Sequence, residues 1–154
     1  MSSWICDNAF MIGLEVQHYL GRARDFLQGM NVLAIEEIYE LNDEIAKFKD
    51  SLALLGIHCA VSYSDALRTG LGCTDVSSED HRNAASDLKS RLASRKFENL
   101  QGADRLGKLL SKKNLITYAA ERATESEIKD IVLQAQRFSA WAEEAGKALR
   151  IEGW

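Results

Sequence analysis

Residues 124–149 read TESEIKDIVLQAQRFSAWAEEAGKAL and give the clearest indication of the fold. Apolar residues recur every three or four positions, which is the spacing of one face of an α-helix. The opening Thr-Glu-Ser-Glu at 124–127 matches a capping box, in which the Thr and second Glu side chains bond each other's backbone N–H groups. We therefore predict a long final helix whose apolar face is wide enough for a core and a partner chain. That face consists of Ile128, Ile131, Val132, Ala135, Phe138, Trp141, Ala142, Ala145 and Leu149.

The chain contains no proline, which favours long helices throughout because proline removes a hydrogen bond from a helix interior. An apolar stripe with helical spacing predicts a first helix over residues 13–28, ended by Gly29 and Asn31. A second stripe predicts a helix over 38–55. Because the connection between the two is short, they are expected to form an antiparallel hairpin.

Three more segments fit helices of different character. Residues 57–71 carry almost no charge, so we predict a central helix that is packed on several sides and ended by Gly70 and Gly72. The run Ser-Ser-Glu-Asp at 77–80 is typical of a helix N-cap followed by an acidic first turn. These helices are predicted over 57–71, 77–95 and 103–113, with a loop over 96–101.

Length and composition indicate one compact domain over residues 1–154, with a core over about 13–150. Apolar residues make up 46% and charged residues 27%, which argues against disorder. The predicted fold class is all-α, an antiparallel up-and-down bundle of about five to six helices. Residues 1–10 do not resemble a cleavable signal, and the uncharged stretch 51–64 is too short to span a bilayer. We expect no membrane association.

Three widely spaced cysteines, Cys6, Cys59 and Cys73, fit reduced thiols in a cytoplasmic protein. Combined with His58 and His81, two of them could form a metal site, but the closely paired spacing of zinc ligands is missing. We therefore predict buried thiols, no metal and no cofactor.

Charge is unevenly distributed along the chain. The net charge is −4, which argues against general coating of nucleic acid, yet residues 82–113 hold nine Lys and Arg against three acidic residues. A basic segment of this kind is either a phosphate-binding face or a solvated helix surface. Charge alone leaves both interpretations open.

The order of the predicted helices and two particular segments carry a family resemblance. A hairpin is followed by GIHCAVSYSDALRTGLG at 56–72, then by a capped helix that includes DHR at 80–82, and then by a basic short helix. The chain continues from residue 112 with KKNLITYAAERATESEIKDIVLQAQRFSAWAEEA. This series resembles the HEPN family of RNA-targeting and toxin–antitoxin proteins over about residues 16–149, most specifically at 56–72 and 112–118.

The resemblance implies a catalytic site at Lys113, Asn114 and Tyr118. Active family members carry arginine, a polar residue that is often asparagine, three variable positions and histidine at the matching places. They cleave RNA without a metal, and the site is commonly completed across a homodimer. Here the spacing is kept, but lysine replaces the arginine and tyrosine replaces the histidine.

Both substitutions weaken the chemistry expected of such a site. Tyrosine titrates near pH 10 and histidine near 6.5, so about one Tyr118 in a thousand would be a basic phenolate at neutral pH. Lys113 can hold a phosphate as a point charge but lacks the planar fork of arginine. Losing general acid–base help typically costs about 10²–10⁴ in rate, so vigorous cleavage at this site is not expected.

Other polar residues are candidates for the site. His81 could supply the missing imidazole beside Arg82 at a helix start, where backbone donors favour phosphate; alternatively it is an ordinary first-turn residue. Lys112 could bind phosphate or complement a helix C-terminus. His58 and Asp65 share one helix face with Ser62, as a binding cluster or as internally satisfied polar groups.

Three functions follow from these features. The first is a HEPN-like homodimer that binds RNA, a nucleotide or a protein within a toxin–antitoxin or defence system, with weakened or lost nuclease activity. Its partner could be an antitoxin nucleotidyltransferase. The second is a metal-independent endoribonuclease toxin. The third is a scaffold whose stripe over 38–55 pairs with another chain as a coiled coil.

Overall fold

The protein is built from helices in every part of the chain that the structure describes. The computed structural model describes residues 3–39, 49–76, 81–118 and 123–154, and these contain no strand. The all-α prediction is therefore confirmed for these ranges. The elements are α1 (Ser3–Tyr39), α2 (Lys49–Gly70), the 3-10 helix η2 (His81–Asn83), α3 (Ala84–Ser94), α4 (Gln101–Tyr118) and α5 (Glu125–Ala148).

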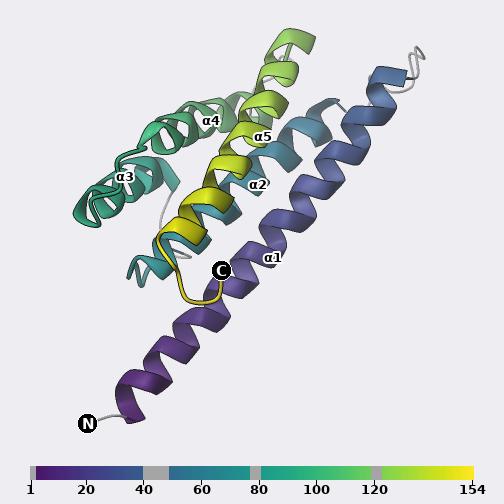
Figure 1. The fold of residues 1–154 in the computed structure, drawn as a ribbon. Coiled ribbons are helices and arrows are strands. Elements are labelled where there is room, and N and C mark those ends of the chain that lie inside the picture. The colour runs from purple at the N-terminus through teal and green to yellow at the C-terminus, as the bar shows by residue number, and fades with distance from the viewer. Residues whose placement is uncertain (1–2, 40–48, 77–80, 119–122) are drawn as a thin grey trace.

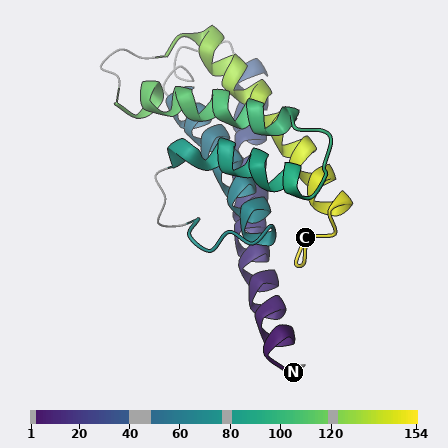
Figure 2. The ribbon, with the colours of Figure 1, turned by 90° about the vertical axis from the view of Figure 1, so that its left-hand side faces the viewer.

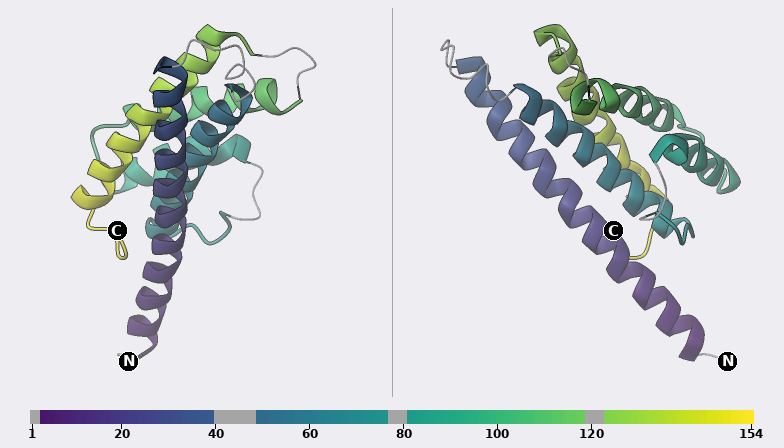
Figure 3. Two further views of the ribbon diagram at one scale, coloured as in Figure 1. Left: turned by 90° about the vertical axis from the view of Figure 1, so that its right-hand side faces the viewer. Right: turned by 180° about the vertical axis from the view of Figure 1, so that it is seen from behind.

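The central helix is α2, which packs against all four other α-helices. α1 lies beside it in the opposite direction, and its first turns project beyond the rest of the molecule (Figure 1). α3 and α4 form an antiparallel pair on the side of α2 away from α1, as the view from behind shows (Figure 3). The prediction of a buried central helix is confirmed, because most side chains from Leu52 to Thr69 are buried.

The up-and-down order predicted for the whole bundle is only partly correct. α1 and α2 are antiparallel, but α5 runs in the same direction as α2 (Figure 1). The α3–α4 pair crosses α1 and α2 at an angle instead of lying along them (Figure 2). This crossing pair returns the chain to the end where α2 begins, so α5 can descend parallel to α2.

The predicted break at Gly29 and Asn31 is wrong, because α1 continues through both residues to Tyr39. Met30, between them, is fully buried, and a Cβ at Gly29 would lie 3.8 Å from Leu55. Burial of the Met30 side chain thus offsets the roughly 1 kcal/mol that a glycine costs inside a helix.

The predicted boundary at residue 56 is also wrong, because α2 starts at Lys49 and runs through Gly56 to Gly70. A Cβ at Gly56 would lie 3.1 Å from the sulfur of Met30 and 3.3 Å from Cβ of Ala135. Gly56 is therefore a point of close approach between α1, α2 and α5. The predicted helix over 38–55 is divided between α1 and α2, and residues 40–48 lie outside the described residues.

The bounds of α3 and α4, the two helices of the crossing pair, differ from the predicted ones. The proposed cap at 77–80 lies outside the described residues, and α3 begins only at Ala84, after η2. The predicted loop before α4 is confirmed: the Phe97 N–H bonds the carbonyl of Leu92 at 3.0 Å and closes α3. α4 is longer than predicted, because it continues through residue 113 to Tyr118.

The capping box of the last helix is confirmed. The backbone N–H of Glu127 bonds Thr124 Oγ1 at 3.2 Å, and the N–H of Thr124 bonds Glu127 Oε2 at 2.7 Å. The apolar face of α5 then packs on α2, with Ile131, Ala135 and Phe138 inaccessible to solvent. The apolar pattern of residues 124–149 therefore packs α5 against α2, and α4 lies beside it.

Candidate functional site

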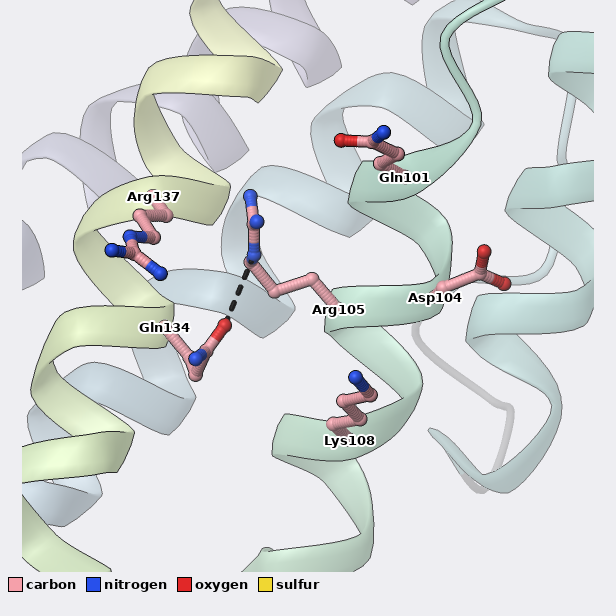
Figure 4. A pocket seen from close by; sticks show the side chains of 6 residues that line it. All are labelled: Gln101, Asp104, Arg105, Lys108, Gln134 and Arg137. Carbon is pink, nitrogen blue, oxygen red and sulfur yellow. Dashed lines mark hydrogen bonds between the residues drawn. The ribbon is translucent and has the colours of Figure 1, made fainter.

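A basic groove lies between α4 and α5. Its volume is about 380 Å³. The α4 wall carries residues one turn apart, and two residues of α5 face them (Figure 4). The lining residues are Gln101, Asp104, Arg105, Lys108, Gln134 and Arg137.

Close packing at one end of the groove sets the separation of the two helices. Gly102 lies against Trp141 so closely that a Cβ would come within 2.0 Å of the indole ring. The indole N–H of Trp141 donates to the carbonyl of Asn99 at 3.0 Å, and Phe138 stacks on the same ring. The start of α4 is thus fixed to the middle of α5, which leaves the polar faces beside it open.

The acidic residues near the groove are already neutralised by lysines. Lys89 of α3 bonds Asp104 at 2.7 Å, and Figure 4 shows the Asp104 side chain directed away from α5. Lys112 forms an ion pair with Asp130. Hydrogen bonds from Lys112 and Gln134 hold the pKa of Asp130 below its ordinary value. Both carboxylates are therefore paired with lysines.

The remaining cations face the open space. The Nε of Arg105 donates to Oε1 of Gln134 at 3.0 Å, which holds the guanidinium across the groove (Figure 4). Lys108 and Arg137 are exposed side chains on opposite walls. Three positive charges within one groove create a potential that favours an anion, and guanidinium groups can hold phosphate oxygens in pairs.

A second hollow of about 250 Å³ continues along the same two helices. It shares Lys108 and Gln134 with the first and adds Ser111, Lys112 and Asp130. The hollow space along α4 therefore extends from Arg105 to the ion pair between Lys112 and Asp130. An elongated space of this kind can accommodate more than a single small anion.

The lining offers binding groups and little for acid–base catalysis. Neither hollow is lined by a histidine or cysteine. Groups that titrate near neutral pH are the usual proton carriers in catalysis. The cations and amides of the lining are groups that can hold an anion.

The predicted catalytic corner is only partly described. Asn114 and Tyr118 belong to α4, but their side chains lie outside the described residues. His81 and Arg82 form most of η2, before α3. Lys113 does not line the groove. Its charge acts on His58 of α2, which places it on a different side of α4 from Lys112.

The predicted cluster along α2 is divided between two environments. His58 is exposed and its ring lies 5.5 Å from that of Phe26. Asp65 is buried and lies 3.7 Å from the guanidinium of Arg68. The carboxylate of Asp65 belongs to an internal ion-pair network, and its predicted binding role stays a prediction.

This internal network was not predicted. Arg68 is completely buried and donates to Asp87 at 2.8 Å, while Arg91 bonds the same carboxylate at 2.9 Å. Burial alone would raise the pKa of Asp87, but the hydrogen bonds from Arg91 and Arg68 bring it below its ordinary value. The network joins α2 to α3 and has the paired arrangement that buried charges require.

The groove residues were also missed as individual candidates, although Arg105 and Lys108 fall within the basic segment. Their spacing with Lys112 is three and four residues, which places all three on one helix face and could have been recognised. Nothing in the sequence shows that Gln134 and Arg137 face them. That pairing depends on how α5 packs beside α4.

The metal hypothesis finds no support in the described part of the chain, where no three His, Cys, Asp or Glu side chains are grouped to hold an ion. Cys59 and Cys73 are buried thiols, as predicted. Burial raises the pKa of Cys59 to about 11, so this thiol stays protonated at neutral pH.

Among the described residues, no helix is long and apolar enough to cross a membrane. Comparisons with family models, with curated proteins and with solved structures found no match.

Proposed function

We propose that this protein binds RNA through its phosphates in the groove between α4 and α5. The observation that supports this most is the set of three cations, Arg105, Lys108 and Arg137, around one hollow whose nearby carboxylates are paired with lysines. A net charge of −4 makes such a local positive surface selective, because the rest of the molecule repels a polyanion. The continuation of the groove toward Lys112 offers space for successive phosphates.

We further propose binding without rapid cleavage, in a HEPN-like component of a toxin–antitoxin or defence system. The support is the likeness of the sequence at 56–72 and 112–118 and the altered residues Lys113 and Tyr118. A cytoplasmic homodimer with an antitoxin nucleotidyltransferase as partner belongs to the same proposal. Light scattering tests the dimer, and a monomer at all concentrations would exclude a site shared between two copies.

Fluorescence anisotropy with a labelled single-stranded RNA tests the groove. Arg137→Ala is expected to weaken binding about tenfold, because charge-assisted hydrogen bonds contribute about 1.5–3 kcal/mol and part is recovered by neighbouring cations. Lys147→Ala is the matched control, since it removes one exposed cation from the same helix outside the groove. Equal affinities for the two variants would contradict the proposal.

The endoribonuclease alternative draws on the pKa of the His58 imidazole, which partial burial lowers and the charge of Lys113 lowers further. Digestion of tRNA and mRNA by the purified protein decides it, with Lys113→Ala and His81→Ala as variants. Cleavage that depends on Lys113 would replace binding as the function. Cleavage that is indifferent to both changes would exclude the predicted corner as its source.

A further inference from the structure

The outer face of α1 carries most of the exposed large apolar side chains in the described part of the chain. Four of the five lie on this helix, and the fifth, Leu133, is on α5. The four are Phe10, Met11, Leu14 and Val32, with exposed fractions of 45% to 65%. α1 therefore presents apolar side chains to solvent as well as those that it packs on α2. Gathered exposed apolar groups are typical of a surface that binds another protein.

The exposed side chains form one continuous face along α1. Exposed residues follow one another at alternating steps of four and three, which is the spacing at which two helices pack along each other. Figure 3 (left) shows α1 in front of the other helices, so a second helix can approach it without meeting them. The face consists of Asp7, Met11, Leu14, His18, Gly21, Asp25, Gln28 and Val32, with Phe10 at its edge.

Gly21 lies at the middle of this face and leaves room for another backbone. A Cβ at Gly21 would lie in open space, so no contact within the molecule requires a glycine there. At Gly56 and Gly102, by contrast, side chains of neighbouring helices stand at that place. Glycine destabilises a helix interior but allows close approach of a second backbone. A partner helix that crosses α1 at Gly21 would use this space.

The order of charges along the face favours an antiparallel partner. In a parallel pair of α1 helices each residue meets its own copy, so Asp25 would face Asp25 and repel it. In an antiparallel pair centred on Gly21, His18 of one copy comes beside Asp25 of the other. These residues lie three positions before and four after the centre, and an imidazole N–H can donate to a carboxylate. Met11 and Val32 lie ten before and eleven after it, so they meet by the same symmetry.

We propose that a second copy of this chain packs antiparallel on the outer face of α1 and forms a two-fold symmetric dimer. Such a dimer uses the same surface on both subunits, so that surface has to complement itself. The face of α1 does so through apolar contacts toward both ends, the pairing of His18 with Asp25 and close approach at Gly21. This inference rests on the homodimer of the proposed function and names its interface, and it is independent of RNA binding in the groove.

Light scattering and sedimentation equilibrium over a concentration series test the interface. Leu14→Asp is expected to raise the dissociation constant of the dimer about 100-fold, because each dimer would bury two unpaired carboxylates. Leu133→Asp makes the same change at the exposed apolar residue of α5 and should leave the dimer unchanged. A dimer that withstands Leu14→Asp would keep the homodimer and overturn this interface. A monomer at every concentration would overturn both.

Cysteine crosslinking tests the direction of packing. Leu14→Cys and Gln28→Cys, each in a Cys6→Ser background, are purified separately and oxidised alone or as a mixture; Cys59 and Cys73 are buried. An antiparallel pair predicts a disulfide-linked dimer in the mixture alone, because either residue lies about 21 Å from its own copy along the helix axes. Crosslinking of each variant by itself would indicate a parallel pair and overturn the proposal. So would a dimer that forms no crosslink in the mixture.

Discussion

At the scale of single residues, Glu143 bonds side chains from several parts of the chain, and no pattern in the sequence indicates this role. Its carboxylate accepts two hydrogen bonds from Arg24 of α1, at 2.8 and 3.0 Å, and one from the hydroxyl of Tyr63 of α2 at 2.9 Å. The indole N–H of Trp154 donates to it at 3.2 Å. The hydrogen bond from Arg24, followed by that from Tyr63, keeps the pKa of Glu143 below its ordinary value. This carboxylate therefore links α1, α2 and α5 to one another and to Trp154, beyond the end of α5.

Glu143→Gln is expected to lower the free energy of unfolding by about 1.5–3 kcal/mol at pH 7, since charged hydrogen bonds are lost. A carboxylate with a lowered pKa stabilises the fold above its unfolded pKa of about 4.3 and loses that effect as pH falls. The difference between wild type and variant should therefore shrink below pH 4. Urea unfolding at pH 7 and pH 3.5 measures it, with the exposed neighbour in Glu144→Gln as control. A difference independent of pH would contradict this role.

Removing the carboxylate of Asp104 should change RNA affinity in the opposite direction from removing a cation of the groove. Asp104→Asn is expected to tighten RNA binding about two- to fivefold, because one negative charge leaves the lining. Lys89→Ala is expected to weaken binding by a similar factor, although Lys89 is not a lining residue, because Asp104 loses its partner. Anisotropy titrations measure both. If Asp104→Asn and Lys89→Ala changed RNA affinity in the same direction, charge in the groove would not control that affinity.

At the scale of elements, two glycines of α4 have opposite surroundings. A Cβ at Gly102 would lie 2.0 Å from the ring of Trp141, whereas a Cβ at Gly107 would meet Cβ of Ala85 at an ordinary 3.6 Å. The first glycine allows α4 and α5 to approach closely at the end of the groove. The second only adds flexibility to the unfolded chain.

Gly107→Ala is therefore expected to stabilise the protein by about 0.5–1 kcal/mol, the cost of glycine relative to alanine inside a helix. Gly102→Ala is expected to destabilise it by about 1–3 kcal/mol through overpacking. Urea unfolding compares the two variants, which make the same chemical change on one helix. If Gly102→Ala were as stable as Gly107→Ala, the contact with Trp141 would not fix the separation of α4 and α5.

At the scale of the whole molecule, local patterns predicted the helices better than their arrangement. The Thr124 cap and the apolar spacing of α5 depend on neighbours in sequence, so they were recognised correctly. Gly29 and Gly56 were taken as helix ends because glycine destabilises an isolated helix. In the folded protein Gly56 sits where helices approach closely, and Gly29 precedes the fully buried Met30, which a single sequence does not reveal.

The residues of the candidate site show the same difference between local sequence patterns, which were recognised, and helix packing, which was not. The basic segment was visible as composition, and Lys112 was selected from it, but its pairing with Asp130 depends on the packing of α5. Arg137 lies far from that segment in sequence and joins it only because α4 crosses α5. Lys113 and His58 were both selected, for unrelated reasons, and the contact between α2 and α4 brings their charges together.

The salt dependence of RNA binding tests the central claim about the groove most directly. Each phosphate contact to a single strand contributes about 0.7 to the slope of log affinity against log salt concentration. The double variant Lys108→Ala with Arg137→Ala is expected to reduce the magnitude of the wild-type slope by about 1.4. An unchanged slope in that variant would contradict the assignment of the groove as the RNA site.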